Sequence, residues 1–118
     1  MRTDGLIKSF DANGAVAANR LCALNANDGE VVQASAASDM LIGASGIVAA
    51  EDGHRIDVHM SDIAEVTYGG AVSRGDLLTS DADGKAVTAT AGDRAVGIAL
   101  VDGVANDIGS VLVYPQAA

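Results

Sequence analysis

Turn-forming dipeptides interrupt this chain so often that only short segments of regular structure fit between them. Asp-Gly, Asn-Gly or Gly-Gly pairs lie at 4–5, 13–14, 28–29, 52–53, 69–70, 83–84 and 102–103. These residues tolerate positive φ, which tight hairpin turns require at their centre. The segments between them are rich in β-branched residues, and the clearest are 30–34, 55–59, 63–68, 85–90, 94–100 and 108–114. The sequence therefore predicts an all-β fold, a small barrel or jelly-roll-like sandwich of short antiparallel strands.

Two segments could be helical instead of extended. Residues 15–24 are rich in alanine, and Asp62 and Glu65 have the spacing of a capped helical turn. However, turn dipeptides bracket the first segment at hairpin distances, and the second runs into the β-prone residues 66–68. We therefore predict strands at both places.

The two halves of the sequence resemble each other. Asp-Gly-x-x-Val-x-Ala-Ser-Ala at 28–36 matches Asp-Gly-x-x-Val-x-Ala-Thr-Ala at 83–91, within pseudo-repeats at about 14–44 and 70–99. Each unit is too small to bury its apolar face alone, so we expect the two to pack together into a single β domain over 1–118. The alternative is chance similarity in a chain rich in Ala, Gly and Asp.

Composition and charge limit the partners that this chain can have. Its net charge of −9 repels phosphate backbones and its seven Lys and Arg residues are scattered, so we expect no nucleic-acid partner. The largely apolar run 40–50 is about half of the ~20 residues that a membrane-spanning helix needs, so we expect no membrane partner. The core must consist mainly of small aliphatic side chains, which favours additional burial in a homo-oligomer such as a dimer or trimer.

The cysteine content predicts the compartment in which the chain is made. Cys22 is the only cysteine, so it cannot form an internal disulfide, and the N-terminus carries no apolar run typical of a signal peptide. We therefore expect synthesis in a reducing cytoplasm. An activated thiolate needs a cationic or imidazole neighbour, and the sequence identifies none, so we expect Cys22 to be a buried apolar residue.

The charged and histidine residues do not predict catalysis, a cofactor or a metal site. His54 and His59 are five positions apart, and this odd spacing places them on opposite faces of a strand, where they cannot bind the same ion. Asp57 shares a face with His59 and Arg55, which we interpret as a solvated strand face of mixed charge.

Several short motifs resemble functional ones but fail a positional requirement. Asp81-x-Asp83-Gly84 has threonine at the first and last ligand positions of a calcium loop, so a hairpin turn explains it better. Residues 43–46 place the second glycine one residue too early for a nucleophile elbow. Arg-Gly-Asp at 74–76 is expected to form a turn, and Gly-Lys at 84–85 lacks the following hydroxyl residue of a phosphate-binding loop.

The second half carries the most specific resemblance to a known family. It reads Gly-Gly-Ala-Val-x-x-Gly-Asp-Leu-Leu-Thr at 69–79, Asp-Gly-Lys-Ala-Val at 83–87 and Val-Gly-Ile-Ala at 96–99. This arrangement resembles the bacteriophage capsid cement, or head decoration, family, and residues 20–43 and 108–114 also fit it. The family has no catalytic residues to carry over to this chain.

The resemblance implies a function for the whole chain. It implies a non-enzymatic virion protein, made in the host bacterial cytoplasm, that binds the capsid exterior and bridges major capsid protein subunits. Residues 1–10 could be an arm that docks on a neighbour. The alternative is a small-ligand or carbohydrate-binding β-domain at a virion or cell surface, although few aromatic residues are present for stacking on sugars.

Overall fold

The computed structural model describes residues 7–117, apart from the side chain of Asp62, and this part of the chain is built from strands without helices. The all-β prediction is therefore confirmed. No helix in residues 7–117 could span a membrane. The strands are β1 (Ile7–Ala12), β2 (Leu21–Leu24), β3 (Glu30–Gln33), β4 (Met40–Ala44), β5 (Arg55–His59), β6 (Asp62–Thr67), β7 (Leu77–Ser80), β8 (Ala86–Thr88), β9 (Arg94–Ala99) and β10 (Ile108–Ala117).

The two segments with helical alternatives both contain strands. Residues 21–24 form β2, while residues 15–20 lead into it as a turn, and the whole of 62–67 forms β6. The second part of the predicted arm, residues 7–10, belongs to β1 and pairs with β5. Residues 1–6 of that arm lie outside the described residues.

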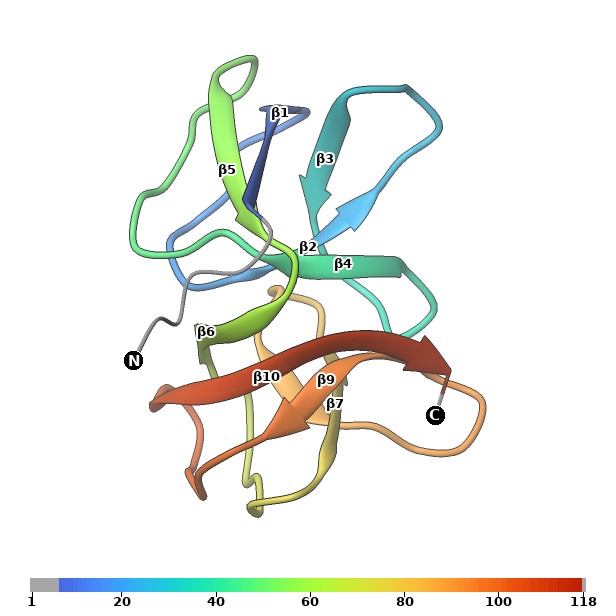
Figure 1. Ribbon diagram of the computed structural model, residues 1–118, viewed down its shortest axis with the longest axis vertical. Coiled ribbons are helices and arrows are strands. Elements are labelled where there is room, and N and C mark those ends of the chain that lie inside the picture. Colours follow the sequence, from blue (N-terminus) through green and yellow to red (C-terminus); the bar gives the residue numbers. More distant parts are fainter. Residues whose placement is uncertain (1–6, 118) are drawn as a thin grey trace.

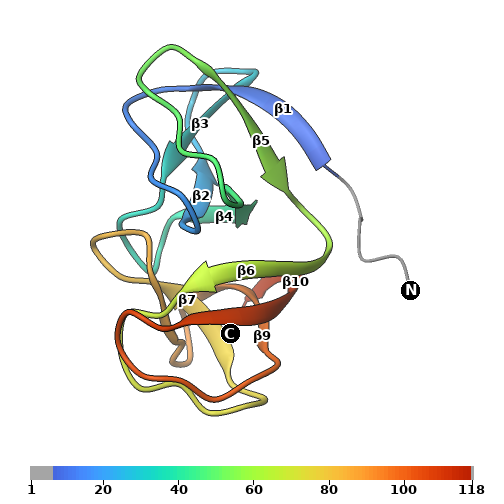
Figure 2. The same ribbon diagram turned by 90° about the vertical axis from the view of Figure 1, so that its left-hand side faces the viewer.

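The strands form two stacked halves, seen as the upper and lower parts of Figure 1 and again, edge-on, in Figure 2. The first half is a closed barrel in the order β1-β3-β2-β4-β5, with β5 paired back to β1. The second half is a sheet in the order β6-β10-β9-β7-β8. A parallel bridge between Tyr68, just after β6, and Ala86 in β8 links its two ends. Counted within each half, the strands therefore follow the same cyclic order.

One strand pair in the barrel departs from the predicted antiparallel arrangement. β1 and β3 run parallel, with Asp11 opposite Glu30 and Ala12 opposite Val31. Strand directions can alternate around a closed ring only when the number of strands is even. A ring of five must therefore contain a parallel pair, which local hairpin signals do not reveal.

Two glycines let the fourth and fifth strands of each half approach closely. A Cβ at Gly43 in β4 would overlap the carbonyl oxygen of His59 in β5. In the same way, a Cβ at Gly97 in β9 would overlap the carbonyl oxygen of Leu112 in β10. Any larger residue at either position would have to displace the neighbouring strand.

The hydrophobic core joins the two halves. One cluster fills the barrel and contains Phe10, Ala12, Val16, Cys22, Val31, Ala50, Ile56 and Val58. A larger cluster combines residues of the first half with most of the buried residues of the second. The alternation of side chains along β2 explains this division, because Cys22 faces the barrel interior while Leu21 and Ala23 belong to the shared cluster.

Main-chain hydrogen bonds also cross between the halves. The Leu21 N–H donates to the Gly84 carbonyl at 2.8 Å, which fixes the tip of the β7–β8 hairpin to the barrel. The Arg94 N–H donates to the Ala37 carbonyl at 2.8 Å. These groups form their hydrogen bonds only when the two halves are packed together. The junction is therefore apolar, and its hydrogen bonds also fix how the two halves are aligned.

Candidate functional site

The outer face of β1 and β5 gathers the charged residues that the sequence placed together. Arg55, Asp57 and His59 lie on one face of β5, as expected, since they alternate with the buried Ile56 and Val58. Arg55 Nη1 lies 3.2 Å from Asp11 Oδ1, and the Ser9 hydroxyl donates to Asp57 Oδ1 at 2.6 Å, so both charged groups are held by β1. Both members of the ion pair are more than half exposed, and such a pair contributes at most about 1 kcal/mol.

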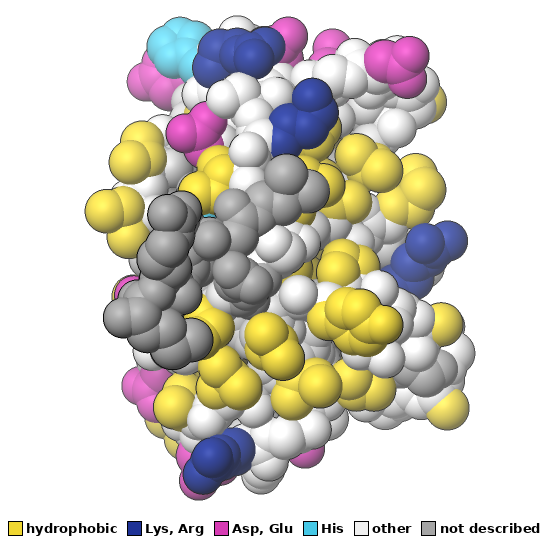
Figure 3. All heavy atoms as spheres, viewed as in Figure 1, with side chains coloured by type: hydrophobic (Ala, Val, Ile, Leu, Met, Phe, Trp, Pro, Cys, Tyr) yellow, Lys and Arg dark blue, Asp and Glu magenta, His cyan; other side chains and the backbone are white. Residues whose placement is uncertain are grey.

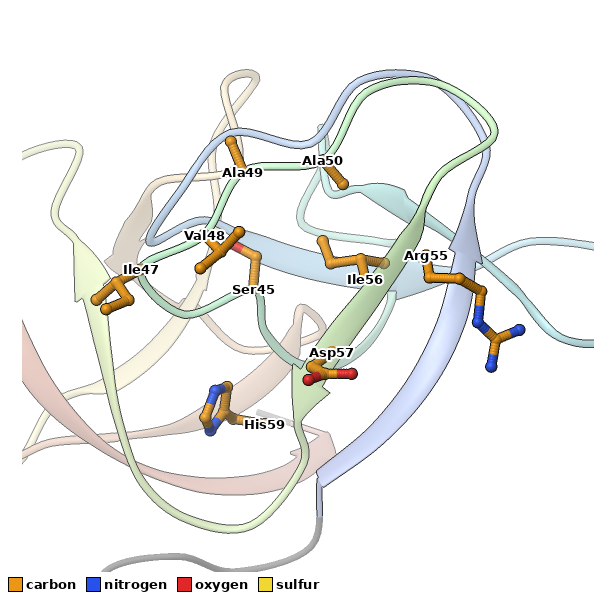
Figure 4. A pocket seen from close by; sticks show the side chains of 9 residues that line it. All are labelled: Ser45, Ile47, Val48, Ala49, Ala50, Arg55, Ile56, Asp57 and His59. Atoms are coloured by element: carbon orange, nitrogen blue, oxygen red, sulfur yellow. The ribbon is translucent and has the colours of Figure 1, made fainter.

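A hollow of about 390 Å³ lies between this face and the loop that follows β4 (Figure 4). Ile47 and Val48 of the loop line it and are 81% and 70% exposed. Ser45 also lines it, but its hydroxyl donates to the Ala17 carbonyl at 2.8 Å and accepts the Arg20 N–H at 3.1 Å. Its hydroxyl therefore holds the loop in place, which gives the 43–46 motif a structural role.

The corresponding loop of the second half, residues 100–107, also exposes aliphatic side chains. Val101 and Val104 are exposed on it, the latter by 61%. Both loops connect the fourth and fifth strands of their half, and both lie on the side of the molecule that is at the left in Figure 1 and faces the viewer in Figure 2. Antiparallel bridges fix them, Val16 with Ala50 in one half and Val72 with Gly103 in the other. The protein thus holds two aliphatic loop tips on one side of a rigid body.

A second apolar surface lies on β10. Ile108, Leu112 and Tyr114 are exposed along one face of this strand, and Leu112 lies directly opposite Ile63 of β6 and Ile98 of β9. Hydrophobic side chains gather over β10 and β9 in the lower half of Figure 3. Contiguous exposed apolar surface is typical of a protein-interaction site.

Cys22 is a core residue, as the sequence predicts. Its side chain is fully buried in the barrel, and burial raises the pKa of the thiol to about 12. The thiol is therefore protonated at neutral pH and is a poor nucleophile.

The Asp81-x-Asp83-Gly84 motif forms a hairpin turn. Asp81 Oδ1 accepts hydrogen bonds from the N–H groups of Asp83 at 2.9 Å and Lys85 at 3.0 Å. This carboxylate oxygen is therefore used to stabilise the turn. The Lys85 ammonium donates to Asn106 Oδ1 at 2.8 Å and so links the turn to the second-half loop.

The Arg-Gly-Asp motif also forms a turn, with Gly75 at a φ of +93°. Asp76 Oδ2 accepts the Ser73 N–H and the Thr88 hydroxyl, both at 3.0 Å. This carboxylate is therefore engaged within the protein.

Metal binding draws no support from the side-chain arrangement. Among the described side chains of residues 7–117, which leave out Asp62, no group of three or more His, Cys, Asp or Glu residues is placed to hold an ion. His54 is exposed before β5 begins and His59 is half-buried at its end. That the protein works without a metal or cofactor stays a prediction.

Sequence reasoning did not identify the exposed aliphatic residues of the loops. A signal was present, because Ile47-Val48 and Val104 stand beside turn glycines and outside the alternating strand patterns. Aliphatic residues in a turn are not needed for a core, so they are candidates for contact with a partner.

Exposed aliphatic loops on a β-structure are typical of proteins that contact other proteins. The chain belongs to the phage cement protein family, whose model matches residues 2–114, so it is a phage virion structural protein. Among solved structures, it is similar to the crystal structure of the head fiber gp8.5 N base in bacteriophage phi29, with a TM-score of 0.72 and 19% identity. The similarity covers 96% of this chain and 97% of that one, and at this identity it supports the fold. No curated protein sequence matches the chain.

Proposed function

We propose that this protein is a non-enzymatic decoration protein that binds the outer surface of the phage capsid and holds neighbouring major capsid protein subunits together. Membership of the cement family supports a role in the virion. The observation that carries the proposal is the pair of aliphatic loops, around Ile47 and around Val104, on one side of a rigid body. Two separate contact sites on one rigid molecule are what a bridge between two subunits needs.

Bridging would allow two weak contacts to give strong binding to the shell. Full burial of one Ile or Val side chain contributes about 1.5–3 kcal/mol, so a single loop would bind weakly. When both loops engage the same shell, the second contact becomes intramolecular, which can raise avidity by about 10²–10⁴. The resistance of the shell to heat would increase because separating two subunits would then require breaking one of these contacts.

The test uses undecorated shells of the phage and the purified protein. We expect the wild-type protein to co-sediment with shells and to raise their melting temperature. Ile47→Ser and Val104→Ser should each weaken binding, and the double variant should lose the rise in shell stability. Leu24→Ser is the matched control, because Leu24 is an exposed aliphatic residue on the β2–β3 hairpin, away from both loops.

The outcomes separate the parts of the proposal. Absence of binding by the wild-type protein would contradict a decoration role. Binding by the double variant equal to that of the wild type would show that the loops are not the contact sites. Lumenal location, shown by protection of the bound protein from external protease in intact shells, would contradict an exterior position.

We also propose that the protein forms a homo-oligomer through the exposed face of β10. Ile108, Leu112 and Tyr114 together expose an apolar strip, which a second copy would cover. Analytical ultracentrifugation should show a dimer or trimer that Leu112→Ser shifts toward the monomer. A monomeric wild type at the highest concentration tested would contradict this part.

The small-ligand or carbohydrate alternative has less support. Of the three aromatic residues, Phe10 and Tyr68 are buried, and Tyr114 lies on β10 rather than in the hollow beside β5. No aromatic ring therefore lines that hollow for stacking on a sugar.

A further inference from the structure

Within residues 7–117, part of the outer edge of β6 has no main-chain partner. Alternate residues of a strand direct their N–H and C=O groups to opposite sides, and in β6 one side faces β10. On the other side, Gly69 and Thr67 donate their N–H groups to carbonyl oxygens at 2.8 and 2.9 Å. The next two residues in this row, Glu65 and Ile63, have no main-chain partner on that side within residues 7–117. An unpaired edge of this kind is a template for another strand.

A hollow of about 270 Å³ adjoins this free edge. Residues 63–65 line one side, and Asn19, Gly46, Ile47 and His59 line the rest. Ile63 and Ile47 supply apolar walls, while Glu65 is an exposed carboxylate. The hollow and the free edge together fit an extended chain that pairs through its main chain and places alternate side chains in the hollow.

Asn19, which lines the same hollow, gives an independent indication that a hydrogen-bond donor is missing there. It has a φ of 55°, in the left-handed region, and its side-chain atom Oδ1 is buried without a hydrogen-bond partner among the described residues. A buried acceptor without a donor carries a free-energy cost. A bound segment that brings an N–H or a charged donor to this wall would remove the cost after a change of the Asn19 rotamer.

We propose that the free edge of β6 receives an extended segment of the major capsid protein, which adds as a strand along residues 63–65. This inference rests on the proposed function. The segment would place an aliphatic side chain between Ile47 and Ile63 and a basic side chain against Glu65. A basic residue is expected because Glu65 is exposed and the whole chain carries a net charge of −9. We expect an extended segment rather than a folded surface, because residues 46–47 line the same hollow next to the edge of β6.

Proline substitution on the free edge tests the proposal. Glu65→Pro removes an N–H that faces away from β10, so the β6–β10 hydrogen bonds remain while strand addition is blocked. Ser9→Pro is the matched control. Ser9 holds the corresponding place on β1, where Asn13 and Asp11 donate outward and Ser9 has no main-chain partner within residues 7–117. Circular dichroism and thermal melting of both variants report whether they fold.

Binding to undecorated shells gives the result. We expect Glu65→Pro to bind at least tenfold more weakly than the wild type, and Ser9→Pro to bind as the wild type does. Glu65→Lys, which keeps the main chain intact, should also bind more weakly, and the loss should shrink as salt is raised. Equal binding by Glu65→Pro, or an equal loss in Ser9→Pro, would overturn the inference while leaving the proposed function standing.

Hydrogen exchange on the wild-type protein tests the same edge without a substitution. The amides of Ile63 and Glu65 should exchange more slowly when the protein is bound to shells. Wild-type binding without this protection would overturn the inference. Failure of the wild type to bind shells would instead overturn the proposed function.

A cross-link identifies the source of the segment. Glu65→Cys can be labelled with a thiol-reactive photo-cross-linker, because the native Cys22 is buried and protonated. Cross-linking to the major capsid protein would support the proposal. Cross-linking only to a second copy of this chain, or no cross-link despite shell binding, would overturn it.

Discussion

Removing one oxygen atom from Tyr68 should measurably destabilise the protein. The side chain is fully buried in the second half, and its hydroxyl donates to the Val101 carbonyl at 2.9 Å. Gly103 and Gly109 leave room for the ring, because a Cβ at either position would overlap it. Tyr68→Phe keeps the ring and removes the hydrogen bond. The carbonyl of Val101 then has no donor on this side.

The magnitude follows from that one interaction. A hydrogen bond of this kind contributes about 1 kcal/mol net, and the unsatisfied acceptor and small void raise the expected loss to about 1–2 kcal/mol. For a domain of this size, the melting temperature should fall by roughly 4–10 °C. Urea denaturation and calorimetry measure both quantities. Tyr114→Phe is the matched control, since Tyr114 is 65% exposed, and it should change stability by less than about 0.5 kcal/mol.

The pH dependence provides a second measurement on the same residue. Burial, with the nearby Asp102 and Asp107 carboxylates, raises the pKa of Tyr68 above its ordinary value of 10.0. The folded state therefore favours the neutral hydroxyl, and this stabilisation is complete below about pH 10 and lost as pH rises above it. The stability gap between wild type and Tyr68→Phe should narrow above pH 10. A destabilisation below about 0.3 kcal/mol at pH 7, or a gap that widens at high pH, would refute the reasoning.

Three further predictions concern other parts of the fold. Three asparagine side chains donate to Glu30 Oε1 at 3.0–3.1 Å and lower the pKa of this carboxyl below its ordinary value of 4.5. The ionised carboxylate should therefore stabilise the folded protein above pH 4.5, and this stabilisation should be lost on acidification. Glu30→Gln should therefore lower the midpoint of urea denaturation more at pH 7 than at pH 3. An equal decrease at the two pH values would contradict this prediction. Cys22 should not react with a thiol reagent at pH 8 unless urea unfolds the protein, and rapid reaction of the native protein would show that the barrel opens. Gly97→Ala should cost about 1–3 kcal/mol in urea denaturation because its Cβ overlaps the Leu112 carbonyl, and wild-type stability would show that β9 and β10 can separate freely.

The sequence was sufficient to predict the strands because their limits depend on local turn chemistry. Asp28-Gly29 and Asp83-Gly84 both lie between paired strands, and both glycines have positive φ. The pseudo-repeats proposed at 14–44 and 70–99 contain the second to fourth strands of each half, and the shared cyclic strand order supports that proposal.

Features that depend on contacts distant in the sequence could not be predicted. The parallel pairing of β1 with β3 follows from closure of a five-stranded ring, and no local pattern encodes closure. Gly43 and Gly97 were visible in the sequence, but only the close approach of the neighbouring strands explains them. The free edge of β6 was likewise hidden, because the sequence does not show which side of a strand lacks a neighbour.

The core shared by the two halves determines how the protein unfolds. Unfolding the second half would expose Leu21 and Ala23 of the barrel and leave the Leu21 N–H without its acceptor. Each half therefore depends on the other, and unfolding should follow a single cooperative transition instead of two. If the two loops contact separate subunits as proposed, force applied at one loop would reach the other through a body that unfolds only as a whole, so the contacts would break before the protein unfolds.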